Sequence, residues 1–519
     1  MIPLLSSSQA LALDAEVEKA WRLESGVLME SAAHRLAHAL IERIGPPDVR
    51  PSPRIVAAAG GGNNGGDALA LLRNLAFAGY RDLAAVIPGR EAKPLCARQA
   101  ASLVAGGIPV VRWNSEEGHR ALAGAEIILD GIAGTGLSAP LAGEPADFVG
   151  AVNSLAREVY SIDLPSGFRD EAGPIDPRVM ASVTLSLEPR KLSLYAPSLR
   201  PLAGRIVAVE DVFPRRPALG NGLLDWIRSK EAGTWLLQQE DIPNLLFHAS
   251  EWSHKGNRGR LAIFAGSPGM AGALFLAARA AQAAGVGLVT LYVRDEMFKS
   301  LGTAGPESIG GAIIRPESTA QAEISRQDAI LAGPGWGRDA SRKTLLSFLL
   351  DTELPLVLDA DALRILHELE STKRKAPLIL TPHPGEFEAL TGHPSAAVLA
   401  SPQEPLAGLA RNRGAFVALK TATTWLMAPD GRFGIIDGGE AGLAVAGSGD
   451  VLAGLIAGLL ARYTTQSGSP SVDDAFAAAS LAILVHLEAG RALRREEGWF
   501  EASRLISGAA AILGRPRKS

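Results

Sequence analysis

Short apolar runs alternate with helical patterns along most of the chain. In the first half these runs cover residues 54–59, 83–87, 108–111, 126–129 and 158–162. Runs of this length favour buried strands, and apolar residues at helical spacing between them favour helices. Strands and helices that alternate over short loops predict a parallel, doubly wound sheet of Rossmann type.

Residues 5–43 precede this pattern and read as helices. Their apolar residues recur at roughly helical spacing, with charges between them: Leu11, Val17, Trp21, Leu28, Leu36 and Leu40. A periodicity of this kind predicts helices with one apolar face.

The second half has the same fold class without repeating the same sequence. Strands are expected at 259–266, 287–293 and 416–419, with others ending near 332, 358 and 380, and helices at 271–284, 451–462 and 473–489. Pro429-Asp430-Gly431 predicts the turn of a hairpin. Residues 213–217 and 219–222 interrupt the pattern and read as the end of one domain and a linker. We therefore expect two α/β domains, residues 1–228 and 229–519.

Composition narrows the class of protein. The chain has 519 residues, 47% hydrophobic and 20% charged, and a net charge of -4, which gives no indication of a nucleic-acid or membrane partner. The single cysteine, Cys96, excludes an intramolecular disulfide and fits a reducing, cytoplasmic compartment. No signal peptide is expected, the tail at 515–518 is basic and expected to be solvated, and apolar runs such as 451–460 are too short to span a bilayer. Apolar positions on the N-terminal helices favour a homo-oligomer.

Polar motifs in the first half fall where predicted strands end. These motifs are Asn63-Asn64, residues 130–136 and residues 163–167. In doubly wound sheets ligands bind outside the carboxyl ends of the strands, so we expect a site there. Asn63 and Asn64 could instead form asx-turns, and Asp130 could cap a loop.

Two kinds of chemistry are candidates at that edge. Asn64, Asp130 and Ser166 offer oxygens that suit a hard, monovalent cation better than zinc. Asp163 is the candidate acid or base.

The second half contains a glycine turn, an aspartate and a small-residue helix in residues 444–462. Amides of Gly447, Ser448 and Gly449 at a helix N-terminus would form an anion hole. Asp450 beside that hole would accept a proton from a hydroxyl while the hole holds a phosphoryl group. The alternative is that Asp450 only caps the helix.

Other polar residues follow strands in this half. His383 shares the predicted sheet edge with Gly335, Lys420 and Asp450, and ligand contact is the favoured interpretation. Asp359, Asp361 and Glu386 could bind magnesium through water or cap helices.

Taken together, these motifs resemble the bifunctional NAD(P)H-hydrate repair enzymes, in which an NAD(P)HX epimerase domain precedes an ADP-dependent NAD(P)HX dehydratase domain of ribokinase-like fold. The N-terminal resemblance lies in residues 28–30, 63–67, 130 with 134–137, and 163–167. The C-terminal resemblance lies in residues 255–259, 272–273, 333–335, 359–361, 381–386 and 447–450.

The resemblance implies a role for individual residues. The hydrated nucleotide in the epimerase would contact Asp163 and the residues Asn63, Asn64, Gly65, Gly66, Asp67, Gly134, Thr135, Gly136, Leu137, Ser138, Ala139 and Pro140. Potassium would be bound by Asn64, Asp130 and Ser166. In the dehydratase the hydrate would contact Ala273, Gly335, His383 and Asp450, and the adenine nucleotide would contact Lys420, Thr421, Ala422, Thr423, Thr424 and Gly449.

Three positions depart from the family pattern. Thr421 stands where glycine is common after the lysine, Ser138-Ala139 where an arginine is common, and Ser31-Ala32-Ala33 where Asn-Ala-Gly is common. The first change bears on the nucleotide loop, and the second on the substrate phosphate.

The implied reaction is repair of NADHX and NADPHX. In the dehydratase, ADP with magnesium would phosphorylate the C6 hydroxyl of the S form and release AMP. Phosphate would then leave, which regenerates NAD(P)H. The epimerase would interconvert the R and S forms. One alternative is a ribokinase-type small-molecule kinase fused to a nucleotide-binding module, and another is a nucleotide-binding protein without catalysis.

Overall fold

The computed structural model describes residues 1–47, 52–89, 92–212, 233–246, 252–301, 310–370, 374–468 and 471–514. Contacts divide the chain into two compact units: residues 3–234 with 399–401 form the N-terminal unit, and residues 1–2, 235–398 and 402–519 form the C-terminal unit. The linker at 213–222, the boundary at 228/229 and the basic tail at 515–518 lie outside the described residues. The two domain ranges stay a prediction.

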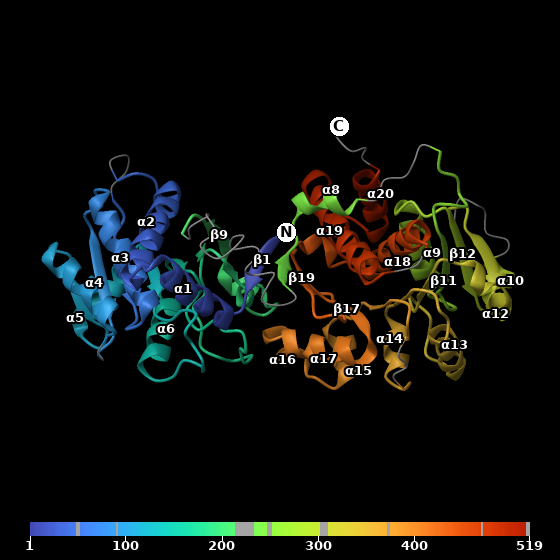
Figure 1. The fold of residues 1–519 in the computed structure, drawn as a ribbon, viewed down its shortest axis with the longest axis horizontal. Helices are drawn as coiled ribbons and strands as arrows, with labels where there is room; N and C mark the ends of the chain where they lie inside the picture. Colours follow the sequence, from blue (N-terminus) through green and yellow to red (C-terminus); the bar gives the residue numbers. More distant parts are fainter. Residues whose placement is uncertain are drawn as a thin grey trace. The chain divides into compact units, whose positions relative to one another are not determined.

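The N-terminal unit contains a parallel sheet in the order β4-β3-β2-β5-β6-β7-β9 (Figure 1). Its strands are β2 (Ile55–Ala59), β3 (Leu83–Ile87), β4 (Val110–Arg112), β5 (Ile127–Gly131), β6 (Glu158–Ile162), β7 (Val183–Leu187) and β9 (Arg205–Val209). The predicted doubly wound sheet is confirmed. β7 and β9 extend it beyond the five strands that the sequence pattern indicated.

Helices cover both faces of this sheet, so its strands are apolar throughout. In β2, Ile55, Ala57 and Ala59 pack with α2 (Ser25–Ile44), α3 (Asn63–Phe77) and α4 (Pro94–Ala105). Val56 and Ala58 pack with α5 (Glu116–Ala123) and α6 (Glu144–Ser154) on the other face. Successive residues of a strand point to opposite faces, which explains the continuous apolar runs.

The N-terminal arm differs in one respect from the prediction of helices alone. It begins with β1 (Ile2–Leu5), which pairs in parallel with β8 (Arg190–Lys191), and continues as α1 (Ser7–Trp21) and α2. Ser6 and Gln9 form a capping box that starts α1 directly after the strand. The pairing places Lys191 at the end of a strand next to this arm.

The C-terminal unit contains a larger sheet, in the order β13-β12-β11-β14-β15-β16-β17-β18-β19. The strands from β13 to β17 are parallel, and β18 pairs antiparallel with both β17 and β19. In order along the sheet the strands are β13 (Ile313–Pro316), β12 (Leu288–Val293), β11 (Arg260–Phe264), β14 (Ala329–Ala332), β15 (Leu356–Leu358), β16 (Leu378–Leu380), β17 (Ala415–Leu419), β18 (Thr423–Met427) and β19 (Phe433–Asp437). The predicted hairpin is confirmed, since Ala428 N donates to Arg432 O across the turn at 2.9 Å.

Two helical layers enclose this sheet (Figure 1). One face carries α9 (Ala271–Ala283), α18 (Ser448–Ser467), α19 (Val472–Glu496) and α20 (Ala502–Leu513), and the other α13 (Ala340–Leu350), α14 (Asp361–Leu366), α15 (Pro384–Thr391) and α17 (Gln403–Arg413). α18 touches α9 almost backbone to backbone. A Cβ added at Gly454 would lie 2.3 Å from Ala277 O, and one at Gly458 would lie 2.8 Å from Ala281 O.

The helix α19 is long and apolar enough to cross a membrane by length and composition alone. However, 78% of its most apolar window is buried inside the protein, in contact with α18 and α20. It therefore has the surroundings of a core helix.

Candidate functional sites

The strand order reverses between β2 and β5, and the chain leaves these two strands toward opposite faces of the sheet. Gly60 and Gly131 meet there, since Gly60 N donates to Gly131 O at 3.0 Å. A Cβ on Gly60 would lie 1.9 Å from Ile132 O, so only glycine fits this approach. Such a switch point is where doubly wound sheets bind ligands.

Asp130 lies completely buried at this point and is held by four hydrogen bonds. Its Oδ1 accepts from Ser166 Oγ at 2.5 Å and from Ile132 N at 3.3 Å. Its Oδ2 accepts from Ser161 Oγ at 2.7 Å and from Ser166 N at 2.9 Å. Burial raises the pKa of Asp130 although these bonds lower it. No ion pair to Asp130 occurs among the described residues.

Asn64 and Ser166 meet at one carbonyl group. Asn64 Nδ2 donates to Ala133 O at 3.1 Å, and Ser166 Oγ, whose hydrogen is donated to Asp130, lies 3.0 Å from the same oxygen. The structure thus brings together the three residues predicted to bind a cation. It also shows Asp130 binding loop amides, as the capping alternative expects, whereas Asn63 and Asn64 begin α3 and do not form a separate turn.

A cavity of about 550 Å³ opens above this cluster. Of the predicted residues it is lined by Asn63, Asn64, Asp67, Gly134, Thr135, Gly136, Leu137 and Asp163. Gly65 and Gly66 are buried in α3, and Ser138, Ala139 and Pro140 lie outside the lining and are exposed. We refer to this space as the N-terminal cavity.

Asp163 forms a buried ion pair in the N-terminal cavity. Lys191 Nζ lies 2.6 Å from Asp163 Oδ1, and the same oxygen accepts from Leu187 N at 3.2 Å. Asp163 has a φ of 64°, a left-handed conformation that aspartate and asparagine tolerate better than most residues. The sequence analysis did not identify Lys191, since no motif surrounds it and the strand pairing with β1 fixes its place.

Two more carboxyl groups enter the same cavity, Asp14 from α1 and Asp67 from α3. Burial raises the pKa of Asp14 to about 6; Lys191 lowers it, whereas Asp163 and Glu18 raise it further. Burial also raises the pKa of Asp67 well above its usual range, and Asp163 and Asp14 add to that rise. Asp14 was not predicted to be a site residue. Its position gave a signal, because it lies three residues from both Leu11 and Val17, on the apolar face predicted for this helix.

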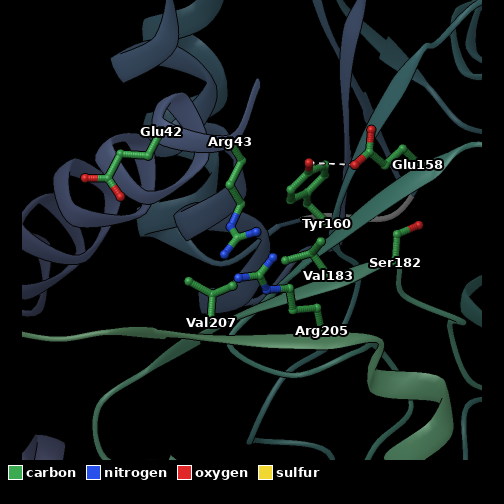
Figure 2. A pocket seen from close by; sticks show the side chains of 8 residues that line it. All are labelled: Glu42, Arg43, Glu158, Tyr160, Ser182, Val183, Arg205 and Val207. Atoms are coloured by element: carbon green, nitrogen blue, oxygen red, sulfur yellow. Dashed lines mark hydrogen bonds between the residues drawn. The ribbon is translucent and has the colours of Figure 1, made fainter. Parts of the chain in front are cut away.

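A second pocket of about 630 Å³ lies at the opposite edge of the sheet (Figure 2). It is lined by residues at or near the starts of β6, β7 and β9 and by the end of α2, with the side chains of Arg43 and Arg205 in its centre. None of the predicted residues lines this pocket. Of these two pockets, only the N-terminal cavity is lined by the polar motifs at the strand ends.

In the C-terminal unit the loops after successive strands are joined at the carboxyl edge of the sheet. Gly333 N donates to Phe264 O, Asp359 N to Ala332 O, Thr381 N to Leu358 O and Lys420 N to Pro382 O, at 2.8–3.1 Å. This order brings Lys420 next to Asp359, although the two lie far apart in the sequence. Gly335 lies against α9, where its added Cβ would be 3.0 Å from Ala273 Cβ.

Asp450 is the third residue of α18, and the helix begins before it. The N-cap is Gly447, with a φ of 91°, so the interpretation of Asp450 as the cap is wrong. Of the three amides predicted to form the anion hole, that of Ser448 already has a partner, since Ser448 N donates to Val445 O at 3.2 Å. The amides of Gly449 and Asp450 belong to the first turn, where no carbonyl group of the helix can accept from them.

Asp450 shares its surroundings with one lysine, Lys420, and two other carboxyl groups, Asp359 and Glu386. Lys420 Nζ lies 2.5 Å from Asp359 Oδ1 and 3.9 Å from Glu386 Oε2. Burial raises the pKa of Asp450 to about 6, and Asp359 contributes to the rise while Lys420 opposes it. Burial alone would lower the pKa of Lys420, but Asp359, Glu386 and Asp450 outweigh it and the pKa is raised.

His383 and Glu386 form a capping box at the start of α15. His383 Nδ1 accepts from Gly385 N at 3.1 Å and from Glu386 N at 3.3 Å, and His383 N donates to Glu386 Oε2 at 2.9 Å. Glu386 thus has the capping role that was one of its two interpretations, and His383 is the N-cap residue itself. The His383 ring is nevertheless exposed, although its Nε2 lies 3.3 Å from Glu386 Oε1, so a ligand could contact the ring from its solvent side.

The remaining predicted residues have local partners. Asp361 accepts from Gly337 N and Arg338 Nε, both at 2.9 Å, and lies in the first turn of α14. Thr421 Oγ1 donates to Thr423 O, and Thr424 Oγ1 donates to Thr421 O at 3.2 Å, which folds the chain into β18. Ala422 is exposed. Among the described residues no group of three His, Cys, Asp or Glu side chains is placed to hold a metal ion.

A buried histidine that the sequence analysis missed supports the start of α18. His486 Nε2, on α19, lies 3.0 Å from Ser448 Oγ and 3.1 Å from Ser448 O. Burial lowers the pKa of His486 to about 4, so the ring is neutral at pH 7. The sequence gives one signal for this histidine, namely its position in the middle of an apolar helix.

Comparisons with known proteins agree on one family. A family profile described as NAD(P)H-hydrate dehydratase matches residues 261–510, and one described as YjeF-related protein N-terminus matches residues 25–193. The bifunctional NAD(P)H-hydrate repair enzyme of Moorella thermoacetica is 32% identical over 517 residues, which cover 95% of this chain and 93% of the relative. That of Thermosynechococcus vestitus is 33% identical over 447 residues, which cover 84% of each chain.

A solved structure similar to about half of this chain is also known. It is the ADP/ATP-dependent NAD(P)H-hydrate dehydratase from Bacillus subtilis, co-crystallised with ATP and Mg²⁺. It is 26% identical, covers 53% of this chain and 96% of its own chain, and gives a TM-score of 0.47.

Proposed function

This chain belongs to the family of bifunctional NAD(P)H-hydrate repair enzymes, and from that premise we propose which residues perform each reaction. It is an isomerase and a lyase: an NAD(P)HX epimerase in its N-terminal half and a nucleotide-dependent NAD(P)HX dehydratase in its C-terminal half. Similarity over 95% of the chain carries this conclusion. It also argues against a small-molecule kinase or a binding protein without catalysis.

For the dehydratase we propose that Asp450 removes the proton from the C6 hydroxyl of S-NAD(P)HX. The oxygen then attacks the terminal phosphoryl group of ADP, and the enamine nitrogen afterwards expels phosphate, which leaves NAD(P)H and AMP. A carboxylate without an ion pair among the described residues, at the N-terminus of α18, supports this role. The amides of Gly449 and Asp450 would stabilise the transferring phosphoryl group.

The other dehydratase residues would bind the two substrates. Ala273, Gly335 and His383 would contact the hydrate, and residues 420–424 with Gly449 would contact the adenine nucleotide. Mg²⁺ would neutralise charge on the phosphates, which are oxygen ligands that this ion prefers together with water. Lys420, which Asp359 positions, would supply a second positive charge.

For the epimerase we propose that the N-terminal cavity binds the nicotinamide end of R- and S-NAD(P)HX, with Asp163 at C6. Asn63 to Asp67 and Gly134 to Leu137 would hold the nucleotide. Potassium suits Asn64, Asp130 and Ser166, since a fully buried carboxylate with no ion pair among the described residues needs a positive charge nearby. A buried, reduced Cys96 supports a cytoplasmic location.

Chemically prepared NADHX containing both epimers tests both activities in one experiment. The protein would be mixed with ADP, Mg²⁺ and K⁺, and recovery of the reduced nicotinamide absorbance followed. Complete recovery is expected. Recovery that stops at the S fraction would contradict the epimerase assignment, and no recovery with either ADP or ATP would contradict the dehydratase assignment.

A further inference from the structure

We propose that Asp14, on α1, is a second catalytic carboxyl group of the N-terminal cavity, and that it serves the face of the reduced ring that Asp163 does not serve. The inference rests on the proposed epimerase function and adds to it a residue outside every motif described above. Asp14 would exchange a proton with the oxygen at C6 on its own side of the ring.

The geometry places the two carboxyl groups on separate elements around one space. Leu11, Asp14, Ala15 and Glu18 of α1 line the N-terminal cavity, and Asp163 enters it from the loop after β6. The volume of about 550 Å³ is in the usual range for a small-molecule site. Because Asp14 and Asp163 reach this space from different elements, we place a flat ring between them, with one carboxyl group on each side.

The reaction explains why one carboxyl group is insufficient. When the C6–O bond breaks, the lone pair of N1 forms a C=N bond, and the oxygen takes a proton from an acid and leaves as water. Water then adds to C6, the C=N electrons return to N1, and the added oxygen loses a proton to a base. A single group on one side would return water to the same face, so inversion at C6 needs a second group on the other.

The two groups also differ in their partners. Lys191 pairs with Asp163 at 2.6 Å, whereas Asp14 has no ion pair among the described residues. The charged groups that face Asp14 are Lys191, Asp163 and Glu18, and Asp67 enters from α3. With a pKa raised to about 6 by burial, Asp14 can both hold and release a proton near neutral pH.

Isotope exchange separates this role from a structural one. NADHX would be incubated with the enzyme in ¹⁸O-water without ADP. The two epimers would then be separated, and the ¹⁸O content of each would be measured by mass spectrometry. In the unaltered enzyme both epimers should interconvert and gain ¹⁸O. In Asp14→Asn, interconversion should fall by about 10²-fold while exchange with retention in one epimer stays within a factor of about three.

The controls make the result decisive. Asp14→Glu should restore much of the interconversion, and Glu16→Gln, on the same helix but outside the cavity lining, should behave as the unaltered enzyme. Equal loss of interconversion and exchange in Asp14→Asn, or no loss of either, would overturn the proposal. Interconversion without any ¹⁸O gain in the unaltered enzyme would also overturn it, because the oxygen would then never leave C6.

Failure of the proposed function gives a different result. If the unaltered enzyme interconverts the epimers no faster than buffer does, the epimerase assignment itself is wrong, and the role of Asp14 is wrong with it.

Discussion

Each half of the chain places an aspartate at the carboxyl edge of a parallel sheet, and the two aspartates have opposite surroundings. Asp163 is fixed to Lys191 at 2.6 Å in a loop with left-handed backbone. Asp450 lies in the first turn of a helix, with its nearest lysine committed to Asp359. The same residue type at the same place in an α/β sheet is thus prepared for two tasks.

The difference follows from what each reaction must move. Epimerisation moves water and protons only, so a cavity with several carboxyl groups and two lysines, Lys93 and Lys191, suffices. Phosphoryl transfer brings a highly charged group to the hydroxyl, so Asp450, the proposed base, lies beside first-turn amides of α18 and near the partly buried ammonium group of Lys420. If this comparison is right, each half can be disabled without the other.

Asp450→Asn should give the largest effect. Loss of the base should lower the rate of dehydration by about 10²–10⁴-fold and leave epimerisation unchanged. Absorbance recovery from S-NADHX measures the first rate, and chiral separation of the epimers measures the second. A loss of less than tenfold, or an equal loss of epimerisation, would contradict the division of labour.

Lys191→Met should weaken the N-terminal unit and its activity together. Removing one partner leaves the buried Asp163 carboxylate unpaired, which costs about 3–5 kcal/mol in the free energy of unfolding. Calorimetry should show an earlier unfolding transition for this unit, and epimerisation should fall while dehydration persists. Adding Asp163→Asn to Lys191→Met removes the unpaired charge and should recover part of the stability; no recovery would argue against the ion pair.

The pH dependence of dehydration should report the charge on Asp450. The base acts only without its proton, and its pKa is raised to about 6, so the rate should fall as the pH drops through about 6. Initial rates with S-NADHX from pH 5 to 8 check this. Asp359→Asn removes the carboxylate that raises this pKa, so it should move the decline to lower pH, and a rate that stays flat to pH 5 would be inconsistent with Asp450 as the base.

Ser138→Arg should give the smallest effect. Ser138 is exposed next to the cavity loop, at the position where the family resemblance leads us to expect an arginine, and an exposed charge contributes about 0.2–1 kcal/mol. The KM of epimerisation should fall about two- to fivefold, and Ser138→Glu should raise it. A shift of both variants in the same direction would show that charge at this position has no part in binding.

Most of the fold could be predicted because buried strands and amphipathic helices leave a periodic pattern. β3 and β6 have the predicted bounds, and β2, α9 and β12 differ by one or two residues at their ends. β1, β7 and β9 were missed because the sequence around them carries proline, glycine and charged residues. Their pairing is decided by neighbours that lie far away in the sequence.

The candidate sites were predictable where a motif carries the chemistry. Asn64, Asp130 and Ser166 meet as the strand-end argument expects, and so do Lys420 and the Asp359 loop. Lys191 and His486 could not be inferred, because each depends on a contact across the fold, with Asp163 and with Ser448. The cap role expected as an alternative for Asp450 failed because the chain turns three residues earlier, at Gly447.

The close packing of α18 on α9 limits how the enzyme can move during its catalytic cycle. Gly454 and Gly458 leave no space between the two backbones, so α18 cannot slide or tilt without breaking contacts along its length. Asp450 stands on this helix, so the position of its carboxyl group is fixed by the packing of the core. Substrates would then have to align themselves with Asp450, because the helix that carries it cannot move toward them.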